Sequence, residues 1–566
     1  MTKRLNNHRG ITVSSTLGNI MEELIDNRIL KTISYTQAQG GGIKGCSTYD
    51  HIFLIRSLIA ISLKEKRPTF LSFYDVSKAF DTVDNEDMLA IMWQKGLKGK
   101  TWRLLKDLTS NLKASVRTRH GNTREIDMEV GGRQGSKLTG RMFSKLMDLL
   151  AEQVIHSEQG IAISRDFIIG ILLRMDDVVS CVEGEQNQLD ILEKIDSFAK
   201  DHKLKWGVGK CKVMPIGKHS NRSQWKLGEL DIQNCTNYKY LGDIISNNGK
   251  NKDNITERRG KMMASTLSIN TIASSEVLNR IETAVLLELH EKISVPTLLN
   301  NAESWDLMIG EQKELQQIEI LNIKCLFNLP TKTPTPAILY SLGIPYTYDR
   351  ISKKQLLYLH RLLNQEPSHW TRKMLNKLES LKLGWSKKIR LTLEEYELST
   401  NFTTIKNIPF PHWKSYVLSA IEKRHKKRLY DECHKTENGH PIPKTKTASI
   451  VHKLNSINYI RKPCDELMSC NKTGCKTVIM ARFGMLECGK NFKGTLTDNC
   501  VVCNTIVDEE HRLNHCKRFS EINFHDSPQK IPFDTVFSTD TDALHKIIER
   551  IKLVWNVSTA HGSMNI

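Results

Sequence analysis

Two short segments of the chain combine apolar runs with aspartate: in the first the aspartate ends the run, and in the second two aspartates lie between apolar stretches. The run TFLSFYD, residues 69–75, is apolar and aromatic, and it predicts a buried strand that ends at Asp75. The run FIIGILLRMDDVVSCV, residues 167–182, has apolar stretches on both sides of Asp176 and Asp177. Aspartate favours turns and the flanking residues favour strands, so this segment predicts a hairpin with adjacent acids at its tip.

Helical patterns fill much of the remaining chain. Residues 69–245 alternate strand-like runs with amphipathic helices, which is typical of an α/β layer, and Asp84 is placed to cap one of these helices. From about residue 250 to 430 the pattern is helical. One helical face is predicted there from apolar residues at helical spacing, namely Leu315, Ile318, Leu321 and Cys325. We therefore predict an α+β fold.

A polar stretch separates a C-terminal module from the helical region. The segment KTENGHPIPKTKT, residues 435–447, has the composition of a linker. Seven cysteines follow residue 463, which sets the last part of the chain apart. The expected division is therefore 1–70, 71–248, 249–434 and 448–566.

The charge balance favours a polyanionic partner. The formal net charge is +19, and an excess of Lys and Arg neutralises phosphates, although a membrane surface also attracts positive charge. The basic N-terminus lacks the apolar stretch of a secretory signal, and the longest apolar run, residues 52–63, is too short to span a bilayer. We expect an intracellular protein, in the nucleus or the cytoplasm, with no membrane partner. Its cysteines are then thiols or metal ligands.

The acids at the predicted strand ends suggest a metal site. A charged pair within an apolar hairpin is costly unless a cation neutralises it, and carboxylate oxygens suit Mg²⁺. Nucleotidyl transfer uses two such ions about 4 Å apart. Because aspartate is also common in plain turns, these residues alone leave a polar turn as an alternative.

Seven segments, read in order, favour the metal site over the polar turn. They are NHRGITVSSTLGNIMEELI (7–25), GGGIKGCSTYDHIFLIRSL (40–58), DVSKAFD (75–81), GGRQGSKLTGRMF (131–143), RMDD (174–177), KLKWGVGKCKVM (203–214) and YKYLG (238–242). In this order they resemble the motifs of reverse transcriptases of non-LTR (LINE-type) retrotransposons. The resemblance implies a polymerase right hand with fingers (1–70), palm (71–248), thumb and connection (249–434) and a C-terminal Cys/His module (448–566).

The resemblance also implies roles for single residues. Asp75, Asp176 and Asp177 would bind two Mg²⁺ or Mn²⁺ ions, and Lys210 would protonate the pyrophosphate. The residues implied to lie against the nucleotide are Phe80, which would exclude a ribose 2′-hydroxyl, and Arg133, Gln134 and Gly135. The implied partners are an RNA template, a DNA primer and deoxynucleoside triphosphates. Strand-edge packing remains the alternative for Phe80, and a solvated surface role, which composition alone favours, remains the alternative for Lys210.

Near the C-terminus, CVVCNTIVDEEHRLNHC has a spacing typical of zinc ligands. It places Cys500, Cys503, His511 and Cys516 at C-x2-C-x7-H-x4-C, which suits a tetrahedral site. The spacing also resembles the zinc-knuckle-like module of LINE-type polymerases. We expect a structural Zn²⁺, and the alternative is a set of unconnected thiols and a surface histidine.

The chain departs from the family's pattern at several positions. Arg174 stands where an aromatic residue is usual, and Thr139-Gly140-Arg141 stands where Ser-Pro and an apolar residue are usual. Glycines replace a proline at position 10 and a phenylalanine at position 41 or 42. No endonuclease or ribonuclease H signature is visible, so we expect part of a longer element protein.

Three hypotheses follow. The first is an active LINE-type reverse transcriptase, and the second is an impaired remnant that binds RNA or RNA–DNA hybrids without polymerising. The third is a group II intron type of enzyme, which YKYLG and the Cys/His spacing disfavour.

Overall fold

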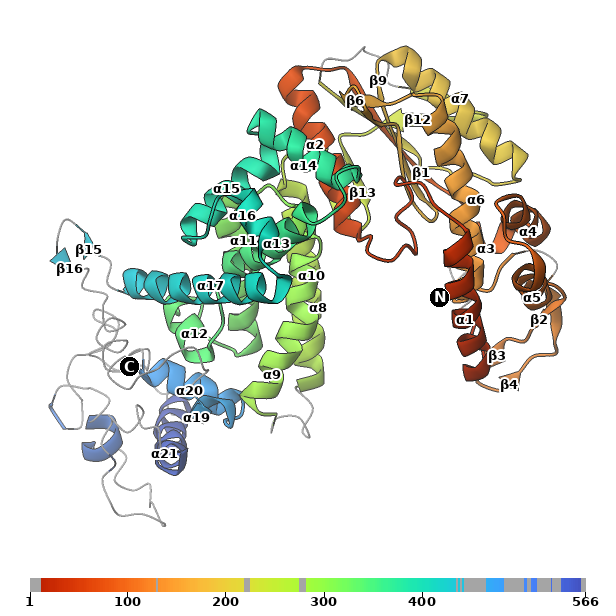
Figure 1. Ribbon diagram of the computed structural model, residues 1–566. Coiled ribbons are helices and arrows are strands. Elements are labelled where there is room, and N and C mark those ends of the chain that lie inside the picture. Colours follow the sequence, from red (N-terminus) through yellow and green to blue (C-terminus); the bar gives the residue numbers. More distant parts are fainter. Residues whose placement is uncertain are drawn as a thin grey trace. The chain divides into compact units, whose positions relative to one another are not determined.

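The computed structural model describes residues 12–128, 131–217, 224–273, 281–433, 436–437, 440–441, 465–482, 503–505, 511–516, 531 and 541–560 (Figure 1). The chain divides into two compact units. Unit 1 comprises Met1–Asn254, Asn301–Asp306 and Tyr358–Leu391, and unit 2 comprises Ile255–Asn300, Leu307–Leu357 and Thr392–Ile566. Among the described residues, no helix combines the length and apolar character needed to cross a membrane. The finer division into four domains stays a prediction.

Unit 1 is built on a six-stranded sheet with the order β11-β12-β10-β1-β9-β8. Its strands are β11 (Gln224–Leu227), β12 (Leu230–Asn234), β10 (Lys212–Ile216), β1 (Thr69–Asp75), β9 (Asp177–Glu183) and β8 (Ile171–Arg174). Strand β1 is antiparallel to both β9 and β10, and every residue of β1 except Asp75 is buried. The predicted strand that ends at Asp75 is thus confirmed, with the acid at the first more accessible position.

The predicted hairpin is confirmed as β8 and β9, but its first apolar stretch is divided. Gly170 separates β8 from β7 (Phe167–Ile169), which pairs with β6 (Ile161–Ser164) instead. A Cβ atom at Gly170 would lie 2.0 Å from the carbonyl oxygen of Gln159, so only glycine permits this close approach.

Helices cover both faces of the sheet. Helices α6 (Lys137–His156) and α7 (Glu185–Asp201) share a core with Phe70 and Tyr74 of β1, and α2 (Thr48–Glu65) lies on the other side (Figure 1). Asp84 caps α4 (Asn85–Gln94) as predicted, because its side chain accepts hydrogen bonds from the following backbone. The other elements of this unit are α1 (Thr16–Thr32), α3 (Ala79–Thr82), α5 (Gly99–Thr109), α14 (Trp370–Leu381), and the short strands β2 (Leu112–Ala114), β3 (Arg117–Thr118), β4 (Gly121–Asn122) and β5 (Ile126–Met128).

A separate hairpin, β13 (Asn237–Tyr240) and β14 (Asp243–Ser246), is anchored by a buried carboxylate. Asp243 accepts a hydrogen bond from Trp305 Nε1 at 2.7 Å and one from Asn301 Nδ2 at 3.2 Å. These contacts explain why residues 301–306 belong to unit 1 although both flanking segments belong to unit 2.

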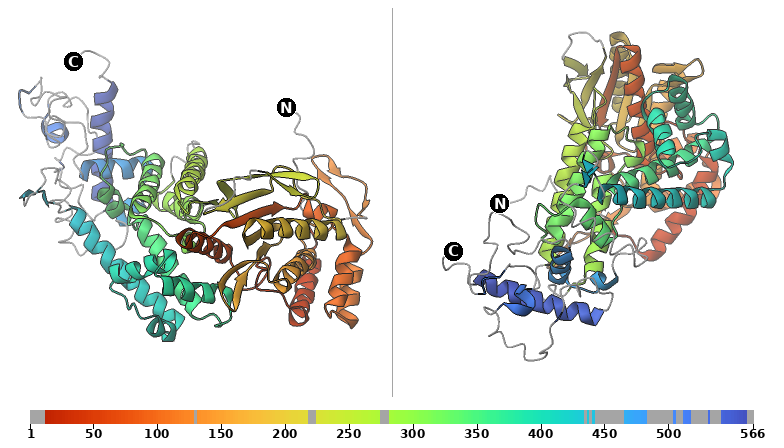
Figure 2. Two further views of the ribbon diagram at one scale, coloured as in Figure 1. Left: turned by 90° about the horizontal axis from the view of Figure 1, so that it is seen from above. Right: turned by 90° about the vertical axis from the view of Figure 1, so that its left-hand side faces the viewer.

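The described part of unit 2 is mostly helical, so the mixed α+β class is confirmed for the chain. The helix predicted from Leu315, Ile318, Leu321 and Cys325 is present as α11 (Ile309–Leu326); Leu315 and Ile318 are buried and Cys325 is partly buried, whereas Leu321 is 52% exposed. Helix α17 (Phe410–Cys433) is continuous in both views of Figure 2. The other helical segments that reach this unit are α8 (Lys252–Ala273), α9 (Thr283–Leu289), a π-helical turn (His290–Ser294), α10 (Val295–Leu299), α12 (Thr335–Leu342), α13 (Thr347–Leu363), α15 (Gly384–Glu395), α16 (Phe402–Asn407), α19 (Asp465–Met468), α20 (Lys472–Arg482) and α21 (Thr541–Ala560).

Candidate active site

The predicted acids meet at one end of the central strands. Asp75, the last residue of β1, pairs in register with Asp177, the first residue of β9. On the other side of β9, Arg174 of β8 pairs with Asp177, which leaves Met175 and Asp176 in the turn. Met175 adopts a φ of 58°, an uncommon conformation for a residue with a side chain. Antiparallel pairing therefore brings together acids that lie about a hundred residues apart in the sequence.

The electrostatics of this cluster favour a cation. Burial, together with the nearby carboxylates of Asp176 and Asp75, raises the pKa of Asp177 to about 6. The positive charges of Arg174 and Lys210 partly offset this rise. Adjacent carboxylates that repel one another gain most from a divalent ion with oxygen ligands, so this donor set fits Mg²⁺ or Mn²⁺.

Lys210 lies directly beside the acids. Its Nζ is 2.9 Å from Oδ2 of Asp75, and the lysine side chain is 61% exposed. The loop before it is fixed by Gly207, whose backbone N–H donates to the carbonyl oxygen of Asp75 at 2.7 Å. A Cβ atom at Gly207 would lie 2.9 Å from Oδ2 of Asp75. Gly207, which the sequence did not single out, is the residue that permits this approach, and the glycines of WGVG were the available signal.

The hairpin of β13 and β14 is attached to the same site through Tyr238. The Tyr238 ring stacks on Phe73 of β1, with 4.1 Å between centroids and 10° between planes. Its hydroxyl donates to the carbonyl oxygen of Lys210 at 2.9 Å. The YKYLG segment thus contacts both the strand that carries Asp75 and the loop that carries Lys210.

The four residues implied for nucleotide contact form a second group. Phe80 is half-buried and packs against Phe143, with 5.3 Å between ring centroids, and its carbonyl oxygen accepts from Gly132 at 2.7 Å. Gln134 donates to Oδ1 of Asp81 at 3.2 Å, and the exposed Gly135 adopts a φ of 111°. These hydrogen bonds connect α3, which carries Phe80, to the segment that precedes α6.

Arg133 is held differently from its neighbours. Its Nη2 donates to Oε1 of Glu22 at 2.8 Å, and Glu22 on α1 is buried. Ser136, which caps α6, donates to the other oxygen of Glu22 at 2.8 Å. The guanidinium of Arg133 therefore joins α1 to the start of α6, and its role toward a nucleotide stays a prediction.

Three of the four predicted zinc ligands lie together. The ligand atoms of Cys503, His511 and Cys516 are all within 4.8 Å of one another. Oγ1 of Thr505 lies 3.2 Å from Nδ1 of His511, a contact of the kind that orients a ligating imidazole. Cys500 lies outside the described residues. Two thiols and an imidazole are a donor set that suits Zn²⁺.

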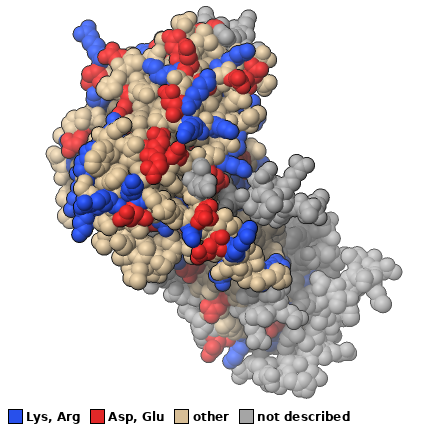
Figure 3. All heavy atoms as spheres, turned by 90° about the vertical axis from the view of Figure 1, so that its right-hand side faces the viewer, with Lys and Arg blue, Asp and Glu red and all other residues tan. Residues whose placement is uncertain are grey.

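Charge is not gathered into a patch of one sign on the face drawn in Figure 3. Lysine and arginine side chains are interspersed there with aspartate and glutamate. The net charge of +19 therefore does not by itself mark a nucleic-acid surface on this face.

Comparison with protein families identifies the N-terminal part of the chain. Residues 1–245 match the family model described as reverse transcriptase (RNA-dependent DNA polymerase). This range contains both groups of site residues described above.

Three relatives are polymerase proteins of mobile elements. The Pol polyprotein of retrotransposable element R2 from Popillia japonica is 27% identical over 25% of this chain and 20% of its own length. The R2DM polyprotein of Drosophila melanogaster is 22% identical over 61% of this chain and 33% of its own length. The RNA-directed DNA polymerase of mobile element jockey from Drosophila funebris is 22% identical over 65% of this chain and 41% of its own length. The chain thus spans less than half the length of these relatives.

Two solved structures show a weaker likeness. Candida albicans telomerase with a fragment of telomeric RNA has a TM-score of 0.30 at 11% identity, over 70% of this chain and 56% of that one. Apo telomerase from Candida tropicalis has a TM-score of 0.33 at 10% identity, over 71% of this chain and 61% of that one. The family model and the retrotransposon relatives together identify residues 1–245 of this chain as a reverse transcriptase domain, related at low identity to those of the non-LTR retrotransposons R2 and jockey.

Proposed function

We propose that this chain is an RNA-directed DNA polymerase of LINE type, which extends a DNA 3′ end along an RNA template with deoxynucleoside triphosphates. The observation that carries the proposal is the pairing of Asp75 with Asp177, next to Asp176 and Lys210. The polymerase right hand, with fingers, palm and thumb, belongs to the same proposal.

The acids are proposed to hold the divalent ions. Asp75, Asp176 and Asp177 offer carboxylate oxygens, and the raised pKa of Asp177 supports a site that is completed by a cation. When bound, Mg²⁺ or Mn²⁺ would stabilise negative charge at the phosphoryl group and activate the primer hydroxyl. The Cys/His group near the C-terminus is proposed to hold a structural Zn²⁺.

Side chains of the protein would supply a proton and position the nucleotide. Lys210 carries a proton that it can give to the leaving pyrophosphate, and its position beside Asp75 supports that role. The ring of Phe80, fixed against Phe143, would exclude a ribose 2′-hydroxyl. Gln134 and Gly135 would lie against the incoming nucleotide, where the absence of a side chain at Gly135 permits close approach.

A second candidate function is binding without polymerisation. It is motivated by Arg174, which replaces an aromatic residue directly before the acid pair. A remnant of this kind would bind RNA or RNA–DNA hybrids with an affinity that falls as salt rises. For either function we propose an intracellular location, nuclear or cytoplasmic, which microscopy of the tagged chain would check.

Primer extension on an RNA template separates the two functions. The purified chain is tested with Mg²⁺ and deoxynucleotides, and the control is the double variant Asp176→Asn, Asp177→Asn. Extension by the wild type that is lost in the control supports the polymerase. No extension, together with salt-dependent binding of the same RNA, supports the remnant.

A further inference from the structure

The turn that carries the acid pair lies against a segment from a distant part of the chain. Leu173 of β8 donates its backbone N–H to the carbonyl oxygen of Ala38 at 2.8 Å. Its own carbonyl oxygen accepts from the N–H of Gly40 at 2.8 Å, so the residue between, Gln39, forms a parallel bridge with Leu173. Strand β8 ends the six-stranded sheet, and this bridge covers its outer edge just before the turn.

Glycines allow the segment to come this close. A Cβ atom at Gly41 would lie 2.5 Å from the backbone nitrogen of Met175. One at Gly40 would lie 2.6 Å from Nε2 of the buried His51. Real Cβ atoms essentially never approach so near, so the contact with the turn requires glycine at position 41, and close packing against His51 favours glycine at position 40.

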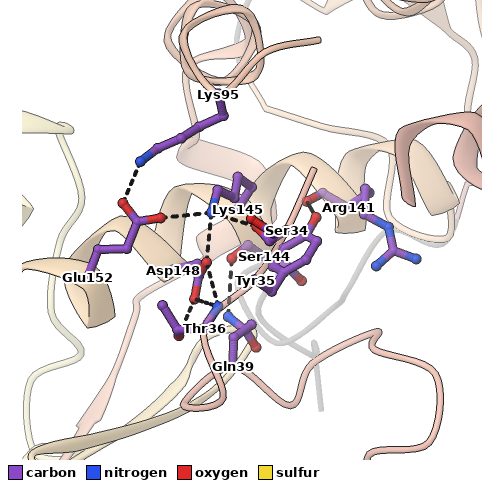
Figure 4. A network of polar contacts seen from close by, with 10 residues as sticks. All are labelled: Ser34, Tyr35, Thr36, Gln39, Lys95, Arg141, Ser144, Lys145, Asp148 and Glu152. Carbon is purple, nitrogen blue, oxygen red and sulfur yellow. Dashed lines mark hydrogen bonds and ion pairs between the residues drawn. The ribbon is translucent and has the colours of Figure 1, made fainter. Parts of the chain in front are cut away.

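Gln39 joins this segment and the turn to helix α6. The side chain is 1% exposed, and its Oε1 accepts from the N–H of Gly41 at 2.7 Å and, more distantly, from that of Met175 at 3.4 Å. Its Nε2 donates to the carbonyl oxygen of Ser144 at 3.1 Å (Figure 4). A buried amide that is satisfied on both ends fixes the groups it joins.

Two residues that depart from the family's pattern hold the same segment. Arg174 donates from Nη1 to the carbonyl oxygen of Gly40 at 3.0 Å, and Arg141 donates from Nη1 to that of Gly42 at 3.0 Å. Arg141 is also paired with Asp26, with 2.6 Å from Nε to Oδ1 and 2.9 Å from Nη2 to Oδ2. Both unusual arginines therefore donate to carbonyl oxygens of one short segment, residues 40–42, which contains the unusual glycine at position 41 or 42.

We infer that Gln39, Arg141 and Arg174 are positioning residues that hold the turn bearing Asp176 and Asp177, and that these departures from the family's pattern are adapted to one another. The inference rests on the proposed polymerase function. Departures that accumulate independently in an eroding sequence are not expected to meet in one set of hydrogen bonds. Arg174, just before the acid pair, then contributes to activity by holding the turn in place.

Placing an aromatic residue at position 174, as is usual in the family, provides the sharpest test. In primer extension under single-turnover conditions, Arg174→Tyr should lower the rate at saturating nucleotide roughly tenfold or more, while the apparent nucleotide affinity changes less than about twofold. An eroded site should instead gain activity from the same substitution. Equal or higher activity of Arg174→Tyr would overturn the inference.

Gln39 has a matched control two residues away. Gln39→Ala should slow extension roughly 10- to 100-fold, because a small misplacement of reacting groups is costly. Gln39→Glu, which keeps an acceptor for Gly41 and Met175, should recover part of the loss. The exposed Gln37, which accepts from Trp370 N–H at 2.7 Å, is the control, and Gln37→Ala should leave the rate unchanged. Equal losses in both alanine variants would contradict a positioning role.

A second measurement does not depend on activity. Hydrogen–deuterium exchange of peptides that cover residues 171–178, in the full chain, should quicken about tenfold in Gln39→Ala and stay unchanged in Gln37→Ala. A wild type that shows no extension but this pattern of exchange would refute the polymerase and still support the positioning contacts. Unchanged exchange in a folded Gln39→Ala would refute those contacts.

Discussion

Asp75 and Asp177 face each other as a register pair between β1 and β9, and this places two carboxylates at the end of buried strands. The arrangement disfavours the ionised form of Asp177, whose pKa is raised from 3.8 to about 6, mainly by burial. The folded chain therefore binds this proton more tightly than the unfolded chain. Without metal, the charge on Asp177 costs stability above about pH 6, and the cost disappears as the pH falls toward 4.

We therefore predict that Asp177→Asn stabilises the metal-free chain at about pH 7.5, by at most about 3 kcal/mol, and much less at about pH 4.5. Denaturant unfolding in the presence of a chelator measures this difference. Asp231→Asn, at an exposed position of β12, serves as the control. Added Mg²⁺ should raise the unfolding temperature of the wild type at the higher pH but not that of Asp177→Asn. A gain in stability that does not depend on pH would contradict the prediction.

Lys210 is predicted to act through its proton as well as its charge. Lys210→Ala should slow nucleotide addition roughly 100-fold, the usual effect of losing a general acid. Lys210→Arg keeps a positive charge beside Asp75 but gives up a proton far less readily, so it should restore little of the rate. Rapid-quench measurement of a single addition tests this. Lys205→Ala, at an exposed position of the same loop, should have no effect, and full recovery in Lys210→Arg would show that charge alone matters.

Gly207 is predicted to be essential for the geometry of Asp75. In Gly207→Ala the new Cβ atom would lie 2.9 Å from Oδ2 and 3.3 Å from the carbonyl oxygen of Asp75. The carboxylate must shift, so extension should slow roughly 10- to 100-fold and half-saturation should need more Mg²⁺. Gly260→Ala, where a Cβ atom meets open space on α8, should keep full activity and gain up to about 1 kcal/mol of stability. Normal Mg²⁺ dependence in Gly207→Ala would count against this account.

The C-terminal Cys/His group is predicted to carry zinc. Purified chain should contain about one equivalent of Zn²⁺ by elemental analysis, and His511→Ala or Cys503→Ser should lose it. Cys325→Ser, which lies outside the group, should keep the metal. Chelation should lower the stability of the wild type and not of His511→Ala. Zinc retained by both ligand variants would refute the site.

Local patterns were sufficient for the elements of the candidate site. The run that ends at Asp75, the hairpin around Asp176 and the cap at Asp84 depend on neighbours in the chain, and the structure confirms all three. Helical spacing did not show which side of α11 is buried, because packing buries Glu319 and Asn322 and leaves Leu321 exposed.

Contacts between distant residues required the tertiary structure. The role of Gln39 depends on α6 and on the turn at Met175, and the return of Asn301 and Trp305 to unit 1 depends on the buried Asp243. None of these partners lies within a helical turn or a strand pair that a pattern could reveal. Local sequence specified which acids are present and which strands carry them, because a run of apolar residues is a local property. The contacts of Arg174 and Arg141 with residues 40–42 are visible only in the folded chain, because a hydrogen bond to a distant carbonyl oxygen cannot be inferred from composition or spacing.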